Sequence, residues 1–313
     1  MRHKFTARIL ISLLLCILAF AVFFTSSWNL SVRSLFPRES RLCACDKCLR
    51  ESTPCVAEII ESSPEPFMSR NTTATEDEFN WWSTLQGNRA NFSVFSETLE
   101  SLFQKIQPIS GVTNFSSDRC KTCAVVGNSG NLKGSHYGPL IDSHDFVIRI
   151  NRGRTEGYEA HVGTRTTHHV MYPESSVKLD NTTYLLFFPF KTRDFYWLNM
   201  NLNVNGPTVS RPVASKDKVM ILRPGFMRYA HENWLGKTGH YPSTGFLAFA
   251  VSTLLCDEVS VFGFGADSDG NWSHYYEILT YKNLKTGGHP GKREYETLRK
   301  LGRKKAIQFF KGW

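Results

Sequence analysis

Short apolar runs recur between residues 123 and 263, and each ends in glycine, proline or polar residues. Continuous apolar runs of this length are typical of strands that are covered on both faces. We therefore predict strands at Cys123–Gly127, Phe146–Asn151, His168–Tyr172, Tyr184–Phe190, Val219–Leu222 and Val259–Gly263.

Stretches with helical spacing flank or separate these runs. Residues 94–107 carry apolar side chains on one helical face, and Phe226–Leu235 forms a second predicted helix. Gly245–Cys256 is apolar nearly all round, which indicates a buried helix. The last stretch, Arg293–Trp313, reads as a basic helix followed by a short closing strand. Strands that alternate with helices predict an α/β fold with a mostly parallel sheet.

The N-terminus contains an apolar run, Ile9–Phe24, with basic residues before it. This pattern predicts a signal anchor with its short tail in the cytoplasm. We expect a tail at 1–8, a transmembrane helix at 9–25, a luminal stem at 26–80 rich in Ser, Thr, Pro and Glu, and a folded domain at 81–313. The alternative is a cleaved signal peptide, since Ala19-Phe20-Ala21 is an acceptable cleavage site. Both interpretations export the body of the chain.

Glycosylation triplets and cysteines agree with export. N-x-[ST] triplets begin at Asn29, Asn71, Asn91, Asn114, Asn181 and Asn271. The chain has 8 cysteines, and Cys16 lies in the predicted anchor. The close spacing of Cys43, Cys45 and Cys48 leaves zinc as an alternative, but an oxidising lumen favours disulfides. An odd number remains outside the anchor, so one thiol is left over, and Cys55 is the candidate.

The formal charge of +9 changes the picture only modestly. A basic body suits an anionic ligand or an anionic membrane surface. The sequence shows no zinc-finger, basic-zipper or RNA-binding signature, so we predict no nucleic-acid partner. It predicts no oligomeric state.

Polar turns at the ends of the apolar runs carry the first candidate chemistry. The turn Gly127-Asn128-Ser129-Gly130 follows the first predicted strand, and its backbone N–H groups can approach a phosphate or a sugar. A tight strand-to-helix turn explains it equally well. Ser243 or Thr244 is suited to cap the buried helix, and the same helix end favours an anion. Gly263 ends the last predicted strand at the same edge.

Two histidines carry the remaining candidate chemistry. His289 lies among glycines and a proline, hence on a loop, and Glu294 follows five positions later. A loop histidine near a carboxylate can serve as a base with a pKa near neutrality. His274 precedes Tyr275, Tyr276 and Glu277. Most histidines are structural or exposed, so neither one defines a site alone.

In combination, these stretches resemble the four conserved motifs of the eukaryotic sialyltransferases. Cys123–Glu174 is similar to the large motif, Tyr241–Asp267 to the small motif, His274–Glu277 to the third motif, and His289 with Glu294 to the very small motif. The motifs stand in the family's order, and the resemblance covers residues 80–313. The Cys43-x-Cys45-x2-Cys48 cluster, Trp81-Trp82 and the closing Phe-Lys-Gly resemble the α-2,3-sialyltransferases that act on Galβ1,3GalNAc.

The resemblance implies a single catalytic domain at 81–313 with a variant nucleotide-binding, GT-A-like fold. It implies inverting transfer of sialic acid from CMP-sialic acid to galactose-terminated glycoproteins or glycolipids. It also implies a single-pass type II protein of the Golgi membrane and no cofactor or metal. Asp267-Ser268-Asp269 reads as a metal-binding D-x-D pattern, but its place at the end of the small motif makes this a coincidence.

The resemblance also implies roles for individual residues. His289 is the expected general base, and His274 is expected near the donor phosphate. Gln86 and Tyr241 match acceptor-side positions. Positions that match donor contacts are Asn128, Ser129, Asn151, Ser243, Thr244, Gly245, Gly263 and His274. The implied disulfides are Cys43–Cys48, Cys45–Cys120 and Cys123–Cys256, which leave Cys55 free.

The chain departs from this subfamily in a few places. The segments 194–218 and 274–289 are shorter, and Pro290-Gly291 replaces acidic and small residues after His289. The departures leave open a sialyltransferase with a different galactoside acceptor. A catalytically silent glycan- or CMP-binding protein is a further alternative, although both His274 and His289 are retained.

Overall fold

The computed structural model describes residues 45, 48–88, 90–106, 109, 120–202, 212–278 and 286–312. Its centre is a seven-stranded sheet with the strand order β5-β4-β3-β2-β1-β6-β7, and every pairing between these strands is parallel. The strands are β1 Thr122–Val126, β2 Phe146–Ile150, β3 His168–Met171, β4 Tyr184–Phe187, β5 Val219–Ile221, β6 Glu258–Phe262 and β7 Gln308–Phe310. The predicted α/β fold with a parallel sheet is therefore confirmed.

The predicted strands coincide with β1 to β6, and the predicted closing strand is β7. The strands β1 to β6 end before the predicted last residues, although several of the next residues still donate one backbone hydrogen bond to the neighbouring strand, as Asn151 does to Val170 at 2.7 Å. The run predicted at Tyr184–Phe190 shows this best, since β4 ends at Phe187. Phe188 donates one more backbone hydrogen bond to Met171 of β3 at 3.0 Å, and both Phe188 and Phe190 are buried in the core.

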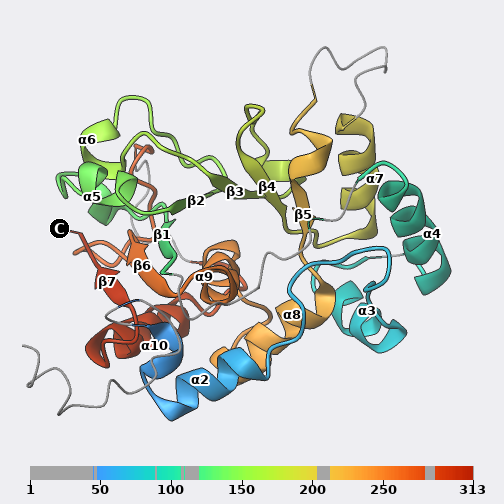
Figure 1. The fold of residues 1–313 in the computed structure, drawn as a ribbon, viewed down its shortest axis with the longest axis horizontal. Coiled ribbons are helices and arrows are strands. Elements are labelled where there is room, and N and C mark those ends of the chain that lie inside the picture. The colour runs from blue at the N-terminus through green and yellow to red at the C-terminus, as the bar shows by residue number, and fades with distance from the viewer. Residues whose placement is uncertain are drawn as a thin grey trace, which may run out of the picture. The chain divides into compact units, whose positions relative to one another are not determined.

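Helices cover both faces of the sheet (Figure 1). The helices are α2 Pro54–Glu61, α3 Glu76–Ser83, α4 Phe92–Phe103, α5 Gly138–Asp142, α6 Glu159–Val162, α7 Thr192–Asn201, α8 Pro224–Tyr229, α9 Thr244–Leu255 and α10 Gly291–Arg303. Short helical turns are η1 Leu49–Glu51, η2 Gly130–Leu132, η3 Pro173–Ser175, η4 Lys216–Lys218 and the π-helical η5 Ala230–Trp234.

Alternation along β1 divides the core into two layers. Cys123 and Val125 pack into the large cluster that contains α9, and Ala124 and Val126 pack into a second cluster with α5 and α6. Successive side chains of a strand point to opposite faces, so one strand supplies both layers. The predicted buried helix is α9, which lies against β1, β2, β3 and β6.

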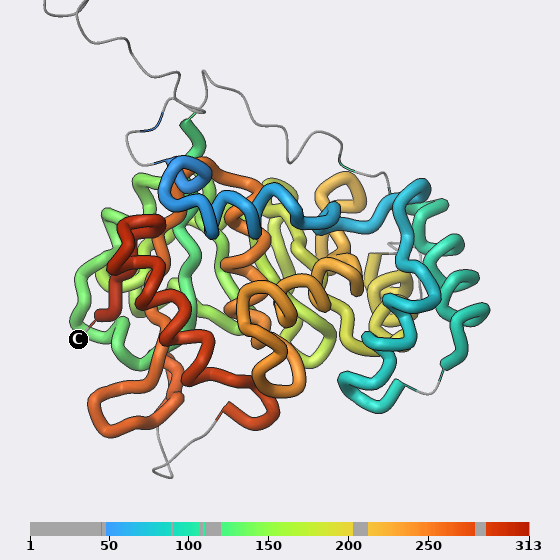
Figure 2. Tube along the Cα trace, turned by 90° about the horizontal axis from the view of Figure 1, so that it is seen from below, coloured from blue at the N-terminus to red at the C-terminus, as the bar shows by residue number. Residues whose placement is uncertain are grey.

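Residues 48–80 differ from the predicted stem, because they belong to the folded body. Val56 and Ile60 of α2 are buried, and Phe79 of α3 is buried as well. The backbone N–H of Met68 donates to the carbonyl of Ile221 in β5 at 2.8 Å. Figure 2 shows this segment as a blue tube that runs along one side of the folded residues to α3. The polar composition suggested a linker, but most of the apolar side chains in the segment, Met68 among them, pack into the core.

Two of the predicted disulfides, Cys45–Cys120 and Cys123–Cys256, are present. Because Cys45 is bonded to Cys120, its sulfur is not free to bind zinc. Cys43 lies outside the described residues, so its pairing with Cys48 stays a prediction. Cys55 is a free, exposed thiol, as the odd count suggested.

None of the helices in the described part of the chain is long and apolar enough to cross a membrane. The anchor predicted at 9–25 lies outside the described residues.

Candidate active site

The order of the strands places a crevice between β1 and β6. Strands β1 to β5 follow one another to one side, whereas β6 and β7 lie on the other side of β1. The strand order therefore reverses between β1 and β6, and ligands bind at such a switch point. A cavity of about 350 Å³ lies here. Among its lining residues are Asn128, Ser129, Asn151, Ser243, Thr244, Gly245, Gly263, His274 and His289.

Glycines let the two loops approach each other closely. A Cβ on Gly127 would lie 2.4 Å from the carbonyl oxygen of Gly263. Gly263 has φ +66°, and a Cβ there would lie 2.4 Å from Leu132. The Ser129 hydroxyl donates to the carbonyl of Gly265 at 2.8 Å. Ser129 thus fastens one loop to the other as well as lining the cavity.

Each predicted asparagine is held by a neighbouring loop. Asn128 Nδ2 donates to the carbonyl of Ile150 at 2.9 Å. Asn151 has φ +56°, a conformation that asparagine tolerates better than most residues. Its Oδ1 accepts from the Ser175 hydroxyl at 2.9 Å, and its carbonyl accepts from His169 Nε2 at 2.6 Å. Burial lowers the pKa of His169 to about 4, so a neutral ring holds Asn151. The sequence reasoning assigned no role to His169 or Ser175.

The N-terminus of α9 opens into the cavity through Thr244 and Gly245. Ser243 is the N-cap, because its Oγ accepts from the backbone N–H of Phe246 at 3.1 Å. Glu294, in the first turn of α10, accepts from the Ser243 backbone N–H and from the Ser243 hydroxyl, each at 2.6 Å. Burial raises the pKa of this carboxyl. The positive end of a helix dipole thus faces a site that suits an anion.

His289 lies on the loop before α10, and its environment fixes its tautomer. Its Nδ1 lies 3.3 Å from the carbonyl oxygen of Tyr241. A carbonyl only accepts, so Nδ1 carries the proton and Nε2 keeps its lone pair. The ring packs edge-on against Tyr241 with 4.7 Å between centroids. Burial lowers the pKa of His289, which favours the neutral, basic form.

The unusual residues after His289 build the turn that presents it. Pro290 is the N-cap of α10, and Gly291 begins this helix. A Cβ on Gly291 would lie 2.5 Å from Thr286, and one on Gly239 would lie 2.8 Å from Pro290. The departure from the subfamily noted in the sequence is therefore accommodated by glycines on both sides.

His274 reaches the cavity from the loop after β6. An antiparallel bridge joins it to Ser129, and the next backbone N–H, of Tyr275, donates to the carbonyl of Asn128 at 2.9 Å. Its Nδ1 lies 2.8 Å from Glu277 Oε1, and its ring stacks on Tyr276. The segment 274–277 is thus hydrogen-bonded to the loop that follows β1.

The predicted acceptor residues lie beside this cavity rather than in its lining. Gln86 Nε2 donates to the Tyr241 hydroxyl at 2.9 Å. Through its carbonyl, Tyr241 contacts His289, so Gln86 lies one residue further from the proposed base. Gln86 also lines an adjoining cavity of about 520 Å³. Tyr241 therefore contacts His289, and Gln86 lies behind Tyr241, further from the cavity.

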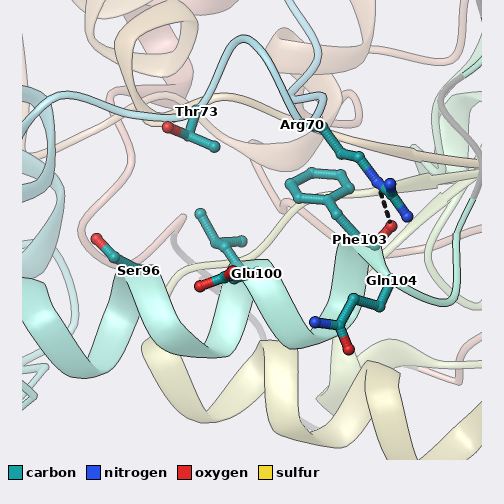
Figure 3. Close-up of a pocket in the computed structure, with 7 residues that line it drawn as sticks. Arg70, Thr73, Ser96, Glu100, Phe103 and Gln104 are labelled. Atoms are coloured by element: carbon teal, nitrogen blue, oxygen red, sulfur yellow. Dashed lines mark hydrogen bonds between the residues drawn. The ribbon is translucent and has the colours of Figure 1, made fainter.

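A further cavity of about 450 Å³ lies between residues 70–73 and α4 (Figure 3). Arg70 Nε donates to the carbonyl of Phe103 at 2.9 Å on its edge. Leu99 and Phe103 line it together with polar side chains. None of the predicted site residues lines this cavity, so it is separate from the crevice.

The fold is a parallel α/β sheet with a cavity at its switch point, and this cavity combines a helix N-terminus that suits an anion with a histidine whose lowered pKa favours the neutral form. The sequence model of glycosyltransferase family 29 (sialyltransferase) matches residues 67–306. The chain belongs to this family.

Two curated relatives carry the name CMP-N-acetylneuraminate-beta-galactosamide-alpha-2,3-sialyltransferase 1. The one from Gallus gallus is 40% identical over 302 residues, which cover 92% of this chain and 87% of that protein. The one from Homo sapiens is 36% identical over 338 residues, which cover 99% of this chain and 98% of that protein.

A solved structure is similar as well. The crystal structure of a mammalian sialyltransferase in complex with Gal-beta-1-3GalNAc-ortho-nitrophenol has a TM-score of 0.75 and 38% identity, and the match covers 87% of this chain and 100% of that chain.

Proposed function

We propose that this enzyme transfers sialic acid from CMP-sialic acid to the 3-hydroxyl of galactose in Galβ1,3GalNAc glycans, with inversion. Membership of the sialyltransferase family, the names of the relatives and the acceptor in the similar crystal structure support this. The observation that carries the proposal is the single cavity at the strand switch point. It gathers Asn128, the α9 N-terminus, His274 and His289 around one space.

The donor lies in the crevice with its anionic groups toward α9. Asn128 and Asn151 contact the cytidine nucleotide, and their hydrogen bonds to neighbouring loops hold them in place. The first N–H groups of α9, at Thr244 and Gly245, face the phosphate or the carboxylate of the donor. The variant GT-A-like arrangement of the nucleotide-binding domain is part of this proposal.

His289 acts as the general base. Its Nε2 takes the proton from the galactose 3-hydroxyl as that oxygen forms a bond to the anomeric carbon of sialic acid. The bond from this carbon to the CMP phosphate oxygen breaks, and CMP leaves with the electron pair. A well-placed base contributes about two to four orders of magnitude in rate. One displacement inverts the anomeric centre, so no covalent intermediate is involved.

His274 stabilises the departing CMP, since negative charge builds on its phosphate as the bond breaks. No metal is proposed for this step. The D-x-D pattern at residues 267–269 has a structural explanation. The Asp267 carboxylate accepts from the backbone N–H groups of Asp269 at 3.0 Å and Asn271 at 2.8 Å, and it closes a turn.

We also propose a Golgi location with type II topology and the catalytic domain in the lumen. The predicted anchor, the N-x-[ST] triplets and the two disulfides support export from the cytosol. Galactose-terminated glycoproteins and glycolipids are the proposed acceptors in that compartment.

A transfer assay tests the reaction and the acceptor together. The 313-residue chain is incubated with CMP-sialic acid and either Galβ1,3GalNAc or Galβ1,4GlcNAc, and mass spectrometry measures product and linkage. We expect product on the first acceptor. Product mainly on the second would contradict the acceptor but keep the enzyme class. CMP binding without product on either acceptor would overturn the proposed activity and favour a silent binder.

A further inference from the structure

A second cavity adjoins the proposed acceptor end of the site. It measures about 520 Å³, and among its lining residues are Gln86, Asn88, Lys191, Thr192, Arg193 and Tyr196. Contacts lead to it from the base, since His289 contacts the Tyr241 carbonyl and the Tyr241 hydroxyl accepts from Gln86. An acceptor whose galactose lies at His289 therefore extends its remaining part in this direction.

The floor of this cavity is held by a pair of hydrogen bonds. Asn88 Nδ2 donates to the Thr192 hydroxyl at 3.0 Å, and the Thr192 backbone N–H donates to Asn88 Oδ1 at 3.2 Å. These bonds join the loop after α3 to the start of α7. The cavity is thus formed before a ligand arrives, which reduces the entropic cost of binding.

Among the described residues at its rim, the two cations differ in how far their charge is exposed. Lys191 Nζ lies 2.6 Å from Glu174 Oε1, and the Lys191 side chain is only 12% exposed. Arg193 lies 3.5 Å from the same oxygen and is 74% exposed. The nearby Asp194 is buried, and its Oδ2 accepts from the backbone N–H groups of Phe190 and Lys191. Glu174 is shared by both cations, and Asp194 also interacts with Lys191, so the mostly exposed Arg193 guanidinium remains available to a ligand.

Tyr196 gives the same cavity an apolar surface. It lies one helical turn after Arg193 on α7 and is 49% exposed, an unusual exposure for a large aromatic side chain. An aromatic ring with a polar tip provides contact area for a sugar or a peptide at low entropic cost. The Arg193 guanidinium suits an anionic group of a ligand, and the Tyr196 ring suits an apolar surface next to that group.

We propose that this cavity is a subsite for the part of the acceptor beyond the reacting disaccharide, where Arg193 binds an anionic group and Tyr196 packs beside it. The anion is a carboxylate of the peptide that carries the glycan or a sulfate on its inner sugar, since a guanidinium binds both. The inference rests on the proposed function, because it places the galactose at His289. It makes acidic acceptors better substrates than neutral ones.

Matched acceptors test this inference. The 313-residue chain receives Galβ1,3GalNAc on a neutral peptide, on the same peptide with flanking aspartates, and on the neutral peptide with a 6-sulfated GalNAc. The ratio of kcat/KM for each acidic acceptor to that for the neutral one is measured at low and at high salt. We expect the wild-type ratio to be about two- to fivefold for at least one acidic acceptor, as for an exposed ion pair, and to fall with salt.

Variants at Arg193 give the decisive comparison. Arg193→Ala should bring the ratio to about one, and Arg193→Glu should reverse it, mainly through KM. Lys178→Ala, which removes an exposed cation elsewhere, is the matched control and should keep the wild-type ratio. The acidic acceptor that responds identifies the source of the anion. Equal ratios in wild type, Arg193→Glu and Lys178→Ala for both acidic acceptors would overturn the subsite. Absence of transfer to any acceptor would instead contradict the proposed function.

Discussion

The buried carboxylate of Glu294 connects α10 to the donor end of the site. It is 6% exposed, and it accepts two hydrogen bonds of 2.6 Å from the backbone and hydroxyl of Ser243. Glu294→Ala removes the acceptor of the Ser243 backbone N–H and of the Ser243 hydroxyl. Ser243 then loses the contact that fixes the first turn of α9.

The magnitude of this loss follows from the two donors. An unpaired buried donor costs about 1–3 kcal/mol, and because Ser243 is only half-buried its two donors together cost about 2–5 kcal/mol. Part of this cost is offset, because burial raises the pKa of Glu294 and the variant no longer buries a carboxylate. We expect Glu294→Ala to lower the free energy of unfolding by about 2–4 kcal/mol. Glu294→Gln keeps one acceptor and should cost about 1 kcal/mol or less.

Urea unfolding followed by tryptophan fluorescence measures the stability, and CMP titration measures the effect on the site. Glu296→Ala is the control, because Glu296 lies two positions later on α10 and is exposed. It should change the free energy of unfolding by about 0.5 kcal/mol at most. We expect about tenfold weaker CMP binding in Glu294→Ala, equivalent to about 1.4 kcal/mol. Unfolding midpoints and CMP affinities equal in Glu294→Ala and Glu296→Ala would refute this reasoning.

The pH dependence has a definite sign. Burial raises the pKa of Glu294 above its ordinary value of 4.5, so the folded protein favours the protonated carboxyl. The protonation of Glu294 contributes fully to the free energy of unfolding below pH 4.5, and this contribution is lost as the pH rises through the raised pKa. Glu294→Gln lacks this dependence. The destabilisation of Glu294→Gln relative to wild type should therefore shrink as the pH rises from 4.5 through the raised pKa of Glu294.

Further predictions concern the chemistry. His289→Ala should lower kcat about 10²- to 10⁴-fold with CMP affinity retained. A fully active variant would refute the role of His289 as the general base. Because burial lowers the pKa of His289, the acid limb of the kcat/KM profile should lie below pH 6.5, and a limb above that value would contradict its neutral form. His274→Ala should reduce kcat more than it weakens acceptor binding, as initial rates at varied acceptor will show. Gly263→Ala should weaken CMP binding and lower stability, since its Cβ would meet Leu132 at 2.4 Å in a positive-φ conformation. Transfer should persist in EDTA, and loss that a divalent ion restores would count against the metal-free reaction.

The features that the sequence predicts best are those whose cause is local. Strands β1 and β6 are buried on both faces, so each appears as a short, mostly apolar run that is followed by glycine. The all-apolar pattern of α9 likewise reports its burial directly. The loops after these strands carry the site, so the motif residues were found where the strands end.

Features with a distant cause were missed. The segment 48–80 looks like a linker, because the hydrogen-bond partner of the buried Met68 is Ile221 of β5, far along the chain. The end of the second predicted helix becomes the π-helical η5, which its composition does not indicate. The contact of Glu294 with Ser243 spans 51 positions, and no periodic pattern records it.

These long-range contacts change how the motifs should be interpreted. Ser129 binds Gly265, and Tyr275 binds Asn128, so the large motif is held by the small and third motifs. Glu294 of the very small motif holds Ser243 of the small motif in the same way. A motif residue can therefore be essential because it supports another motif, without contacting donor or acceptor. Loss of activity on mutation does not separate these roles, whereas unfolding and CMP binding measured on the same variant do. By this criterion we expect Glu294 to act as a positioning residue and His289 as a catalytic one, although a single motif contains both and both line the cavity.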